Sequence, residues 1–237
     1  MNDHLPLRGL QLAALGVIGC CLAACSAGQQ GTPLAIQSVA KIGLELTATG
    51  FFVDNDGHVV TADHAVEDCT KLYLEKEGHT IPTTVVAQSP EDDIALLKVP
   101  ETLGIPAVFA RTAATAENEL VFAASYQTLA GMVRQGQTLS NAVVTSAGPT
   151  SIEMISSASY GTSGAPVLNA KGLVVGIVTH RESTERVLAT NADRAKSMLA
   201  AHGVAFEEDD QPQLSAMQDR AHRANTISVS VLCFKHG

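Results

Sequence analysis

Short apolar runs separated by turn residues fill the chain between residues 38 and 189. A first set comprises residues 38–46, 50–53, 58–61, 71–75, 80–88 and 94–99. A second set comprises residues 120–125, 133–139, 142–146, 151–156, 165–169, 173–179 and 186–189. Strands at this spacing, with turn residues between them, are typical of all-β barrels and sandwiches. The pattern therefore predicts an all-β fold of two antiparallel barrels with about six strands each.

The pattern changes near the C-terminus, where apolar residues take helical spacing over residues 192–201 and 214–225. Residues 226–234 then alternate, with Ile227, Val229 and Val231 on one face, which predicts a half-buried terminal strand. The acidic residues 207–210 are expected to form a solvated loop. We place an N-terminal lobe at residues 37–110, a C-terminal lobe at 111–203 and a C-terminal helix and strand extension at 204–237.

Residues 1–24 have the features of an export signal. Arg8 precedes an apolar run of about 13 residues, which fits a signal-peptide core and is shorter than the roughly 20 residues of a membrane span. A single-pass anchor is the alternative. The core ends in LAAC, which resembles the lipobox of bacterial lipoproteins and implies a lipid on Cys25. Cys20 is the second candidate, and both could simply be small apolar residues. Residues 25–36 have the composition of a flexible tether.

The overall composition limits the classes of function. Hydrophobic residues make up 46% of the chain and charged residues 16%, as in a globular protein. The formal net charge of -9 argues against a nucleic-acid partner, because binding many phosphates needs a basic surface. Beyond the export signal and Cys25, the cysteines that remain are Cys69 and Cys233. In an oxidising compartment these two could form a disulfide, or each could be a small buried hydrophobic residue.

Three segments carry candidate chemistry. In YGTSGAPVLN, Ser163 stands between two glycines, so it is either a turn residue or a nucleophile. In GFFVDNDGHVVTADHAVEDC, a predicted strand ends just before His64. Asp93 immediately precedes the apolar run 94–99, where a carboxylate could orient an imidazole, although it could also be an ordinary turn residue.

The order TADH, DDIALL and YGTSGAPVLN resembles the trypsin-like serine peptidases of the chymotrypsin fold, particularly bacterial relatives of the Deg (high-temperature-requirement) proteases. The resemblance covers roughly residues 43–203. It implies that Ser163 attacks the scissile carbonyl, that His64 accepts the serine proton and that Asp93 orients His64. The N–H groups of Gly161 and Ser163 would form the oxyanion hole. Asp63, where a small residue is usual, places a second carboxylate near His64 and should raise the pKa of its imidazole.

The resemblance also implies where the substrate side chain binds. The expected pocket has its base at two residues and its walls at four others: Ser157 and Ala158, then Tyr160, Thr179, His180 and Arg181. Because no carboxylate is expected at the base, small or medium apolar side chains should be preferred over Arg or Lys. Thr179 matches a position whose hydroxyl commonly supports the buried aspartate, but it could equally be an ordinary strand residue.

Together these features predict an exported, lipid-anchored serine endopeptidase that cleaves polypeptides through an acyl-enzyme and uses no metal ion or cofactor. It would lie on the periplasmic or cell-surface face of a bacterial membrane. About 37 residues follow the helix predicted to end near Ala200, too few for the PDZ domain that often follows in Deg proteases. The alternatives are a non-catalytic protein-binding module of the same fold and a structural envelope lipoprotein.

Overall fold

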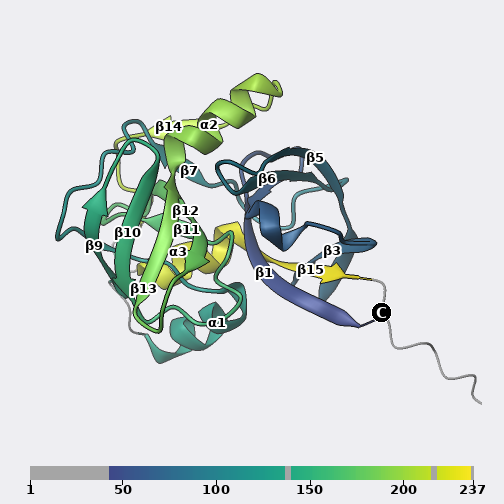
Figure 1. The fold of residues 1–237 in the computed structure, drawn as a ribbon, viewed down its shortest axis with the longest axis horizontal. Helices are drawn as coiled ribbons and strands as arrows, with labels where there is room; N and C mark the ends of the chain where they lie inside the picture. The colour runs from purple at the N-terminus through teal and green to yellow at the C-terminus, as the bar shows by residue number, and fades with distance from the viewer. Residues whose placement is uncertain (1–42, 137–139, 215–217, 236–237) are drawn as a thin grey trace, which may run out of the picture. The chain divides into compact units, whose positions relative to one another are not determined.

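The computed structural model describes residues 43–136, 140–214 and 218–235. The predicted export signal, the tether and Cys25 lie outside the described residues. Within the described ranges, no helix combines the length and the apolar composition that crossing a membrane requires. The described chain forms two curled sheets, shown in Figure 1, with one helical segment running between them. This confirms the predicted fold of two barrel-like β lobes, although the sheets contain seven and eight strands instead of about six each.

The first sheet contains seven strands that pair in the order β4-β3-β15-β1-β2-β6-β5, all antiparallel. Their bounds are β1 (Leu44–Phe52), β2 (His58–Thr61), β3 (Lys71–Lys76), β4 (His79–Pro82), β5 (Thr84–Ser89), β6 (Ile94–Lys98) and β15 (Ser228–Phe234). The runs expected at 38–46 and 50–53 form one strand over their described part, because Gly50 pairs with Thr61 and Val229 instead of breaking the ladder. The run expected at 80–88 is divided between β4 and β5.

The second sheet contains eight strands, seven of them in the order β14-β7-β12-β13-β10-β9-β8, with β11 pairing with β12. Their bounds are β7 (Val108–Ala110), β8 (Leu120–Val121), β9 (Ala142–Ala147), β10 (Ser151–Ser156), β11 (Pro166–Leu168), β12 (Val174–Arg181), β13 (Arg186–Asn191) and β14 (Glu207–Asp209). Strand β7 is parallel to β12 and to β14, and the other pairs are antiparallel. The solvated loop expected at 207–210 is therefore wrong, since its backbone pairs with β7.

The helical segments are η1 (Asp63–Ala65), α1 (Tyr126–Gln135), α2 (Ala192–Ala201) and α3 (Arg220–Ile227). The strand expected from residue 133 is wrong in its described part, because residues 133–135 end α1. Leu129 is fully buried, and Met132 and Val133 pack against the same core, so this segment has the three-and-four spacing of a helix. Helix α2 matches its predicted range, whereas α3 starts later than the predicted residue 214.

The C-terminal strand β15 lies between β1 and β3, so the end of the chain completes the first sheet (Figure 1). Cys233 on β15 forms a disulfide with Cys69, with their Cα atoms 5.4 Å apart. Where α3 meets β15, the buried Lys76 Nζ donates hydrogen bonds of 2.7 Å to the carbonyl oxygens of Asn225 and Ser228. Burial lowers the pKa of Lys76 to about 8.

One cluster of buried side chains contains members from both sheets and from α2 and α3. Within it, the rings of Phe51 from β1 and Phe109 from β7 lie 6.1 Å apart. Two further clusters of buried apolar side chains belong to one sheet each. The shared cluster joins the sheets, so loops that leave each sheet toward the other can meet.

Candidate active site

His64 lies in η1, the short helical turn that follows β2. Its Nδ1 atom is 2.8 Å from Asp93 Oδ2 and 3.0 Å from Asp93 Oδ1. The backbone N–H of His64 also donates to Asp93 Oδ1, at 3.0 Å. One carboxylate therefore contacts both the ring and the main chain of the histidine, which fixes the orientation of the imidazole.

Asp93 occupies the last position of the turn before β6 and has a φ of 51°, in the left-handed region that Asp adopts more readily than most residues. The preceding Asp92 anchors this turn to the second sheet and α2. Its carboxylate accepts hydrogen bonds of 2.7 and 3.0 Å from Arg194 on α2. Its carbonyl accepts one of 2.6 Å from the Thr190 hydroxyl on β13. Neighbouring carboxylates thus have different roles, one holding the turn and the other facing His64.

The electrostatic environment favours an ionised Asp93 beside His64. The hydrogen bond with Asp93 raises the pKa of His64 although burial opposes this, and the carboxylates of Asp93, Asp63 and Glu67 raise it further. Burial acts to raise the pKa of Asp93, but the hydrogen bonds from the ring and backbone of His64, together with the charges of His64 and His180, lower it overall. An ionised carboxylate only accepts hydrogen bonds, so His64 Nδ1 carries the proton and neutral Nε2 is an acceptor.

Ser163 comes from the loop between β10 and β11 of the second sheet, and its Oγ lies 3.1 Å from His64 Nε2. The same hydroxyl is 3.4 Å from the Thr179 carbonyl oxygen. Hydrogen bonds to carbonyl groups of this loop hold it against β1 of the first sheet. Thr49 N–H donates to the Ser163 carbonyl at 2.9 Å, and the Thr49 hydroxyl donates to the Gly161 carbonyl at 2.7 Å. A single residue of β1 therefore positions the segment that carries the serine.

Gly164 allows this close approach. Its φ is 80°, and a Cβ atom added there would lie 2.1 Å from the Thr49 carbonyl oxygen and 2.4 Å from Thr61 Oγ1. Both distances are too short for any side chain. The glycine that follows Ser163 is thus required by contact with the first sheet as well as by backbone conformation.

Gly161 has a φ of 82°, which turns the backbone just before Ser163. Within the described part of the chain, the N–H groups of Gly161 and Ser163 do not donate to a protein acceptor. Neither N–H group is therefore occupied by an acceptor of the described residues. The intervening Thr162 is buried, and its hydroxyl donates to the Ser159 carbonyl at 2.6 Å.

A cavity of about 360 Å³ opens beside Ser163. It is lined by Ala158, Ser159, Tyr160, Gly161, Thr162, Ser163, Val178, Arg181, Glu182, Ser183, Thr184 and Val187. Of the residues predicted for the substrate pocket, Ala158, Tyr160 and Arg181 line this cavity, whereas Ser157, Thr179 and His180 do not. The Arg181 guanidinium lies over the Tyr160 ring, 5.3 Å from its centroid. Glu182, which the sequence did not single out, adds a carboxylate to the lining.

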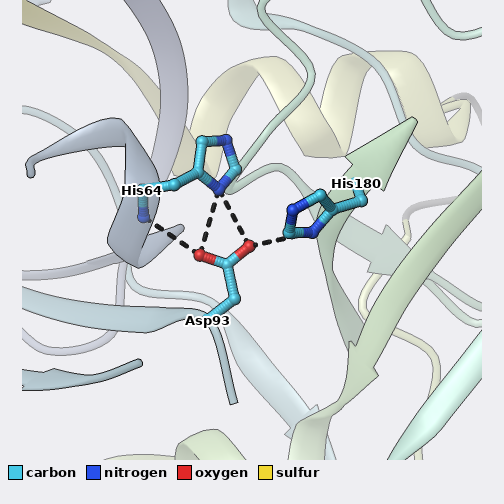
Figure 2. Close-up of side chains that lie close together, drawn as sticks. All are labelled: His64, Asp93 and His180. Atoms are coloured by element: carbon cyan, nitrogen blue, oxygen red, sulfur yellow. Dashed lines mark hydrogen bonds and ion pairs between the residues drawn. The ribbon is translucent and has the colours of Figure 1, made fainter. Parts of the chain in front are cut away.

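Thr179 and His180 on β12 have other partners. The Thr179 hydroxyl donates to the Leu188 carbonyl at 3.3 Å, and it is His180 that reaches the aspartate. His180 Nδ1 lies 3.3 Å from Asp93 Oδ2, and its ring centroid is 5.2 Å from that of His64 (Figure 2). The sequence placed His180 in the pocket wall, because the alternation of a strand does not reveal a contact with a loop of the other sheet.

Comparisons with known proteins agree with this arrangement. The family model described as a trypsin-like peptidase domain matches residues 48–177, which is more than half of the chain. This chain belongs to the trypsin-like peptidase family. The matched residues include His64, Asp93 and Ser163.

Two relatives and one solved structure are similar to this chain. An uncharacterized protein of Sinorhizobium fredii, y4bJ, is 27% identical over 202 residues, 78% of this chain and 32% of that protein. A probable periplasmic serine endoprotease of Chlamydia pneumoniae, described as DegP-like, is 40% identical over 52 residues, 22% of this chain and 11% of that protein. The crystal structure of the Rv3671c protease in an inactive form has a TM-score of 0.52 and 23% identity, covering 67% of this chain and 85% of that chain.

The resemblance to Deg-type peptidases is thereby confirmed at the level of the family, and the solved structure supports the fold. The chain spans about a third or less of the length of the two relatives.

Proposed function

We propose that this chain is a serine endopeptidase that hydrolyses polypeptides through an acyl-enzyme formed on Ser163. The observation that carries the proposal is the continuous series of contacts from Asp93 through His64 to Ser163. The ring of His64 is 2.8 Å from the carboxylate on one side and 3.1 Å from the hydroxyl on the other. A serine hydroxyl becomes a useful nucleophile when a base lies within hydrogen-bond reach and a third group orients that base.

In the proposed mechanism, Ser163 Oγ attacks the scissile carbonyl carbon while His64 Nε2 accepts the hydroxyl proton. Asp93 stabilises the imidazolium that results, because its pKa is low enough for it to stay ionised. The Gly161 and Ser163 N–H groups donate to the oxyanion. His64 then returns the proton to the leaving amine, and a water molecule activated by the same base hydrolyses the ester.

The cavity beside Ser163 supports a substrate residue with a small or medium apolar side chain before the cleaved bond. Ala158, Val178 and Val187 contribute apolar surface, and Val178 and Val187 are almost completely buried. Arg181 and Glu182 add opposite charges, so neither sign of charge dominates the pocket. We do not expect the pocket to select Arg or Lys before the cleaved bond.

We place the protein in the bacterial cell envelope, held to a membrane by a lipid on Cys25. The relative described as a periplasmic endoprotease supports an envelope location, and the LAAC segment supports the anchor. Cys25→Ser should then abolish acylation and leave an unprocessed or soluble form. Mass spectrometry that shows an unmodified N-terminus, created by cleavage elsewhere, would contradict the anchor.

Turnover of a protein substrate such as casein tests the activity. Ser163→Ala should lower kcat/KM by on the order of 10⁴-fold or more, while Tm changes little. Because nucleophile and base act as a unit, His64→Ala and the double variant should lose similar amounts. Ser197→Ala, at an exposed position on α2, is the matched control. If purified Ser163→Ala cleaved casein as fast as the wild type, with contaminating protease excluded, Ser163 would be a turn residue and not the nucleophile.

A further inference from the structure

Three potential metal ligands meet at Asp93. His64 Nδ1 and His180 Nδ1 approach the same oxygen, Asp93 Oδ2, at 2.8 and 3.3 Å (Figure 2). One ligand atom from each of the three residues can be chosen so that all lie within 4.8 Å of one another. The three come from η1, the turn before β6, and β12, so both sheets contribute. The acid–base pair of the proposed mechanism uses only two of them, and His180 takes part only through its charge, which helps to lower the pKa of Asp93.

The donor set fits a transition-metal ion. Two imidazoles and one carboxylate are typical of zinc sites that keep a fourth coordination position open, and imidazole disfavours Mg²⁺ and Ca²⁺. Zinc bonds of 2.0–2.1 Å in a tetrahedral site place ligand atoms about 3.4 Å apart. The separation between His180 Nδ1 and Asp93 Oδ2 already has this value. The side chain of His180 is 63% exposed, so a rotation of its ring can adjust the separation between its Nδ1 and that of His64. The 2.8 Å between His64 Nδ1 and Asp93 Oδ2 must widen by about 0.5 Å when the ion replaces the shared proton.

The surroundings of the three ligands suit a bound cation. The backbone N–H of His64 donates to Asp93 Oδ1, which orients the carboxylate while Oδ2 remains available to the ion. The carboxylates of Asp63 and Glu67 act on His64 through their negative charge, and they would attract a cation to the same place. The rings of His64 and His180 lie at an angle of 44°, so they do not stack face to face and close the space.

We propose that His64, Asp93 and His180 form a binding site for Zn²⁺, and that the bound ion switches the peptidase off reversibly. Coordination uses the lone pair of His64 Nδ1, so the single ring proton must move, through solvent, to Nε2. In that tautomer Nε2 donates to Ser163 instead of accepting from it, and the base is lost. The inhibition rests on the proposed function, whereas the binding of zinc does not.

Calorimetric titration of the full chain with Zn²⁺ tests the binding. The Ser163→Ala protein keeps all three ligands, and we expect one zinc site in it that His180→Gln weakens by on the order of 10-fold or more. Adding His79→Gln to Ser163→Ala, at an exposed histidine of β4, should leave this site unchanged. Equal affinity and stoichiometry with and without His180→Gln would overturn the proposal. As a second readout in the same protein, saturating Zn²⁺ should shift the ¹⁵N resonance of His64 Nδ1, and an unchanged resonance would also overturn it.

Inhibition of turnover tests the switch. The turnover rate of each variant is normalised to its own rate in the presence of a chelator. The Zn²⁺ concentration that halves this rate should be at least 10-fold higher for His180→Gln than for the wild type. Excess chelator should restore the wild-type rate. Zinc that binds at this site without slowing turnover would overturn the switch. If no variant turned over substrate, the proposed function would fail, while the calorimetry would still decide the metal site.

Discussion

The two sheets hold their halves of the active site in different ways. In the first sheet, side chains fix the acid and base, with Asp93 contacting the ring and N–H of His64 and Asp92 tying the turn to Arg194. In the second sheet, contacts to the main chain fix the nucleophile loop: Thr49 of β1 donates from its N–H and its hydroxyl to carbonyl groups of the loop, and Gly164 approaches β1 closely. We therefore expect substitutions in the first half to change the chemistry with little effect on the fold, and substitutions in the second half to disturb the fit of the backbone.

The largest effect is expected where backbone fit is broken. Gly164→Ala should abolish turnover and lower the free energy of unfolding by about 3 kcal/mol or more, because both the positive φ and the contact with Thr49 oppose a Cβ. Gly78→Ala is the matched control, since Gly78 has a φ of 84° and no atom within 4 Å of an added Cβ. That variant should lose only about 1 kcal/mol. Chemical denaturation and peptide turnover measure both quantities.

If Gly164→Ala retained wild-type stability and turnover, the loop would not depend on its contact with β1. Equal destabilisation by Gly164→Ala and Gly78→Ala would show that backbone conformation alone matters.

The next effect concerns the chemistry of the first sheet. Asp93→Asn should lower kcat by orders of magnitude, up to about 10⁴-fold, because an amide can hold His64 in the wrong tautomer. Its Tm should change much less than that of Gly164→Ala. Asp92→Asn, one residue earlier, removes a charge that faces Arg194 and should keep far more of the turnover. Similar losses of kcat in the two variants would remove the distinction between the anchoring and the orienting carboxylate.

Local patterns in the sequence were sufficient for much of this architecture. The alternation and turn signals predicted most strands, including the terminal strand, and the three motifs singled out residues that the structure brings within hydrogen-bond distance. Helix α1 was missed because Val133 was assigned to a strand and its helical spacing with Leu129 and Met132 was not recognised. That β15 completes the first sheet could not be derived, since local patterns do not determine strand order.

The contact of His180 with Asp93 and the presence of Glu182 in the cavity were also outside the reach of local patterns. Both depend on how β12 and the turn after it lie against loops distant in sequence. The sequence does indicate that a residue near position 179 could support the aspartate, and His180, which directly follows Thr179, is the residue that contacts it.

The smallest expected effect is on pH dependence. Turnover requires neutral His64, and its pKa is raised, first by the hydrogen bond with Asp93 and further by Asp63. In buffer with a chelator, kcat/KM should therefore fall with decreasing pH, with a midpoint above the ordinary histidine value of about 6.5. Asp63→Asn should move the midpoint to lower pH and can still accept the hydrogen bond from Gln88. Asp68→Asn removes the charge of an exposed carboxylate in the same segment and should leave the midpoint unchanged. A midpoint that did not move in Asp63→Asn would contradict this contribution.

In the proposed mechanism, His64 from the first sheet is the base that activates Ser163 from the second. Covalent labelling with a fluorophosphonate, followed by peptide mass spectrometry, measures this most directly, because the reagent reports the nucleophilicity of an individual serine. We expect the reagent to modify Ser163 of the wild type in preference to every other serine. We also expect a labelling rate that falls by orders of magnitude in His64→Ala. Labelling at another serine, or an equal rate at Ser163 without His64, would contradict this mechanism.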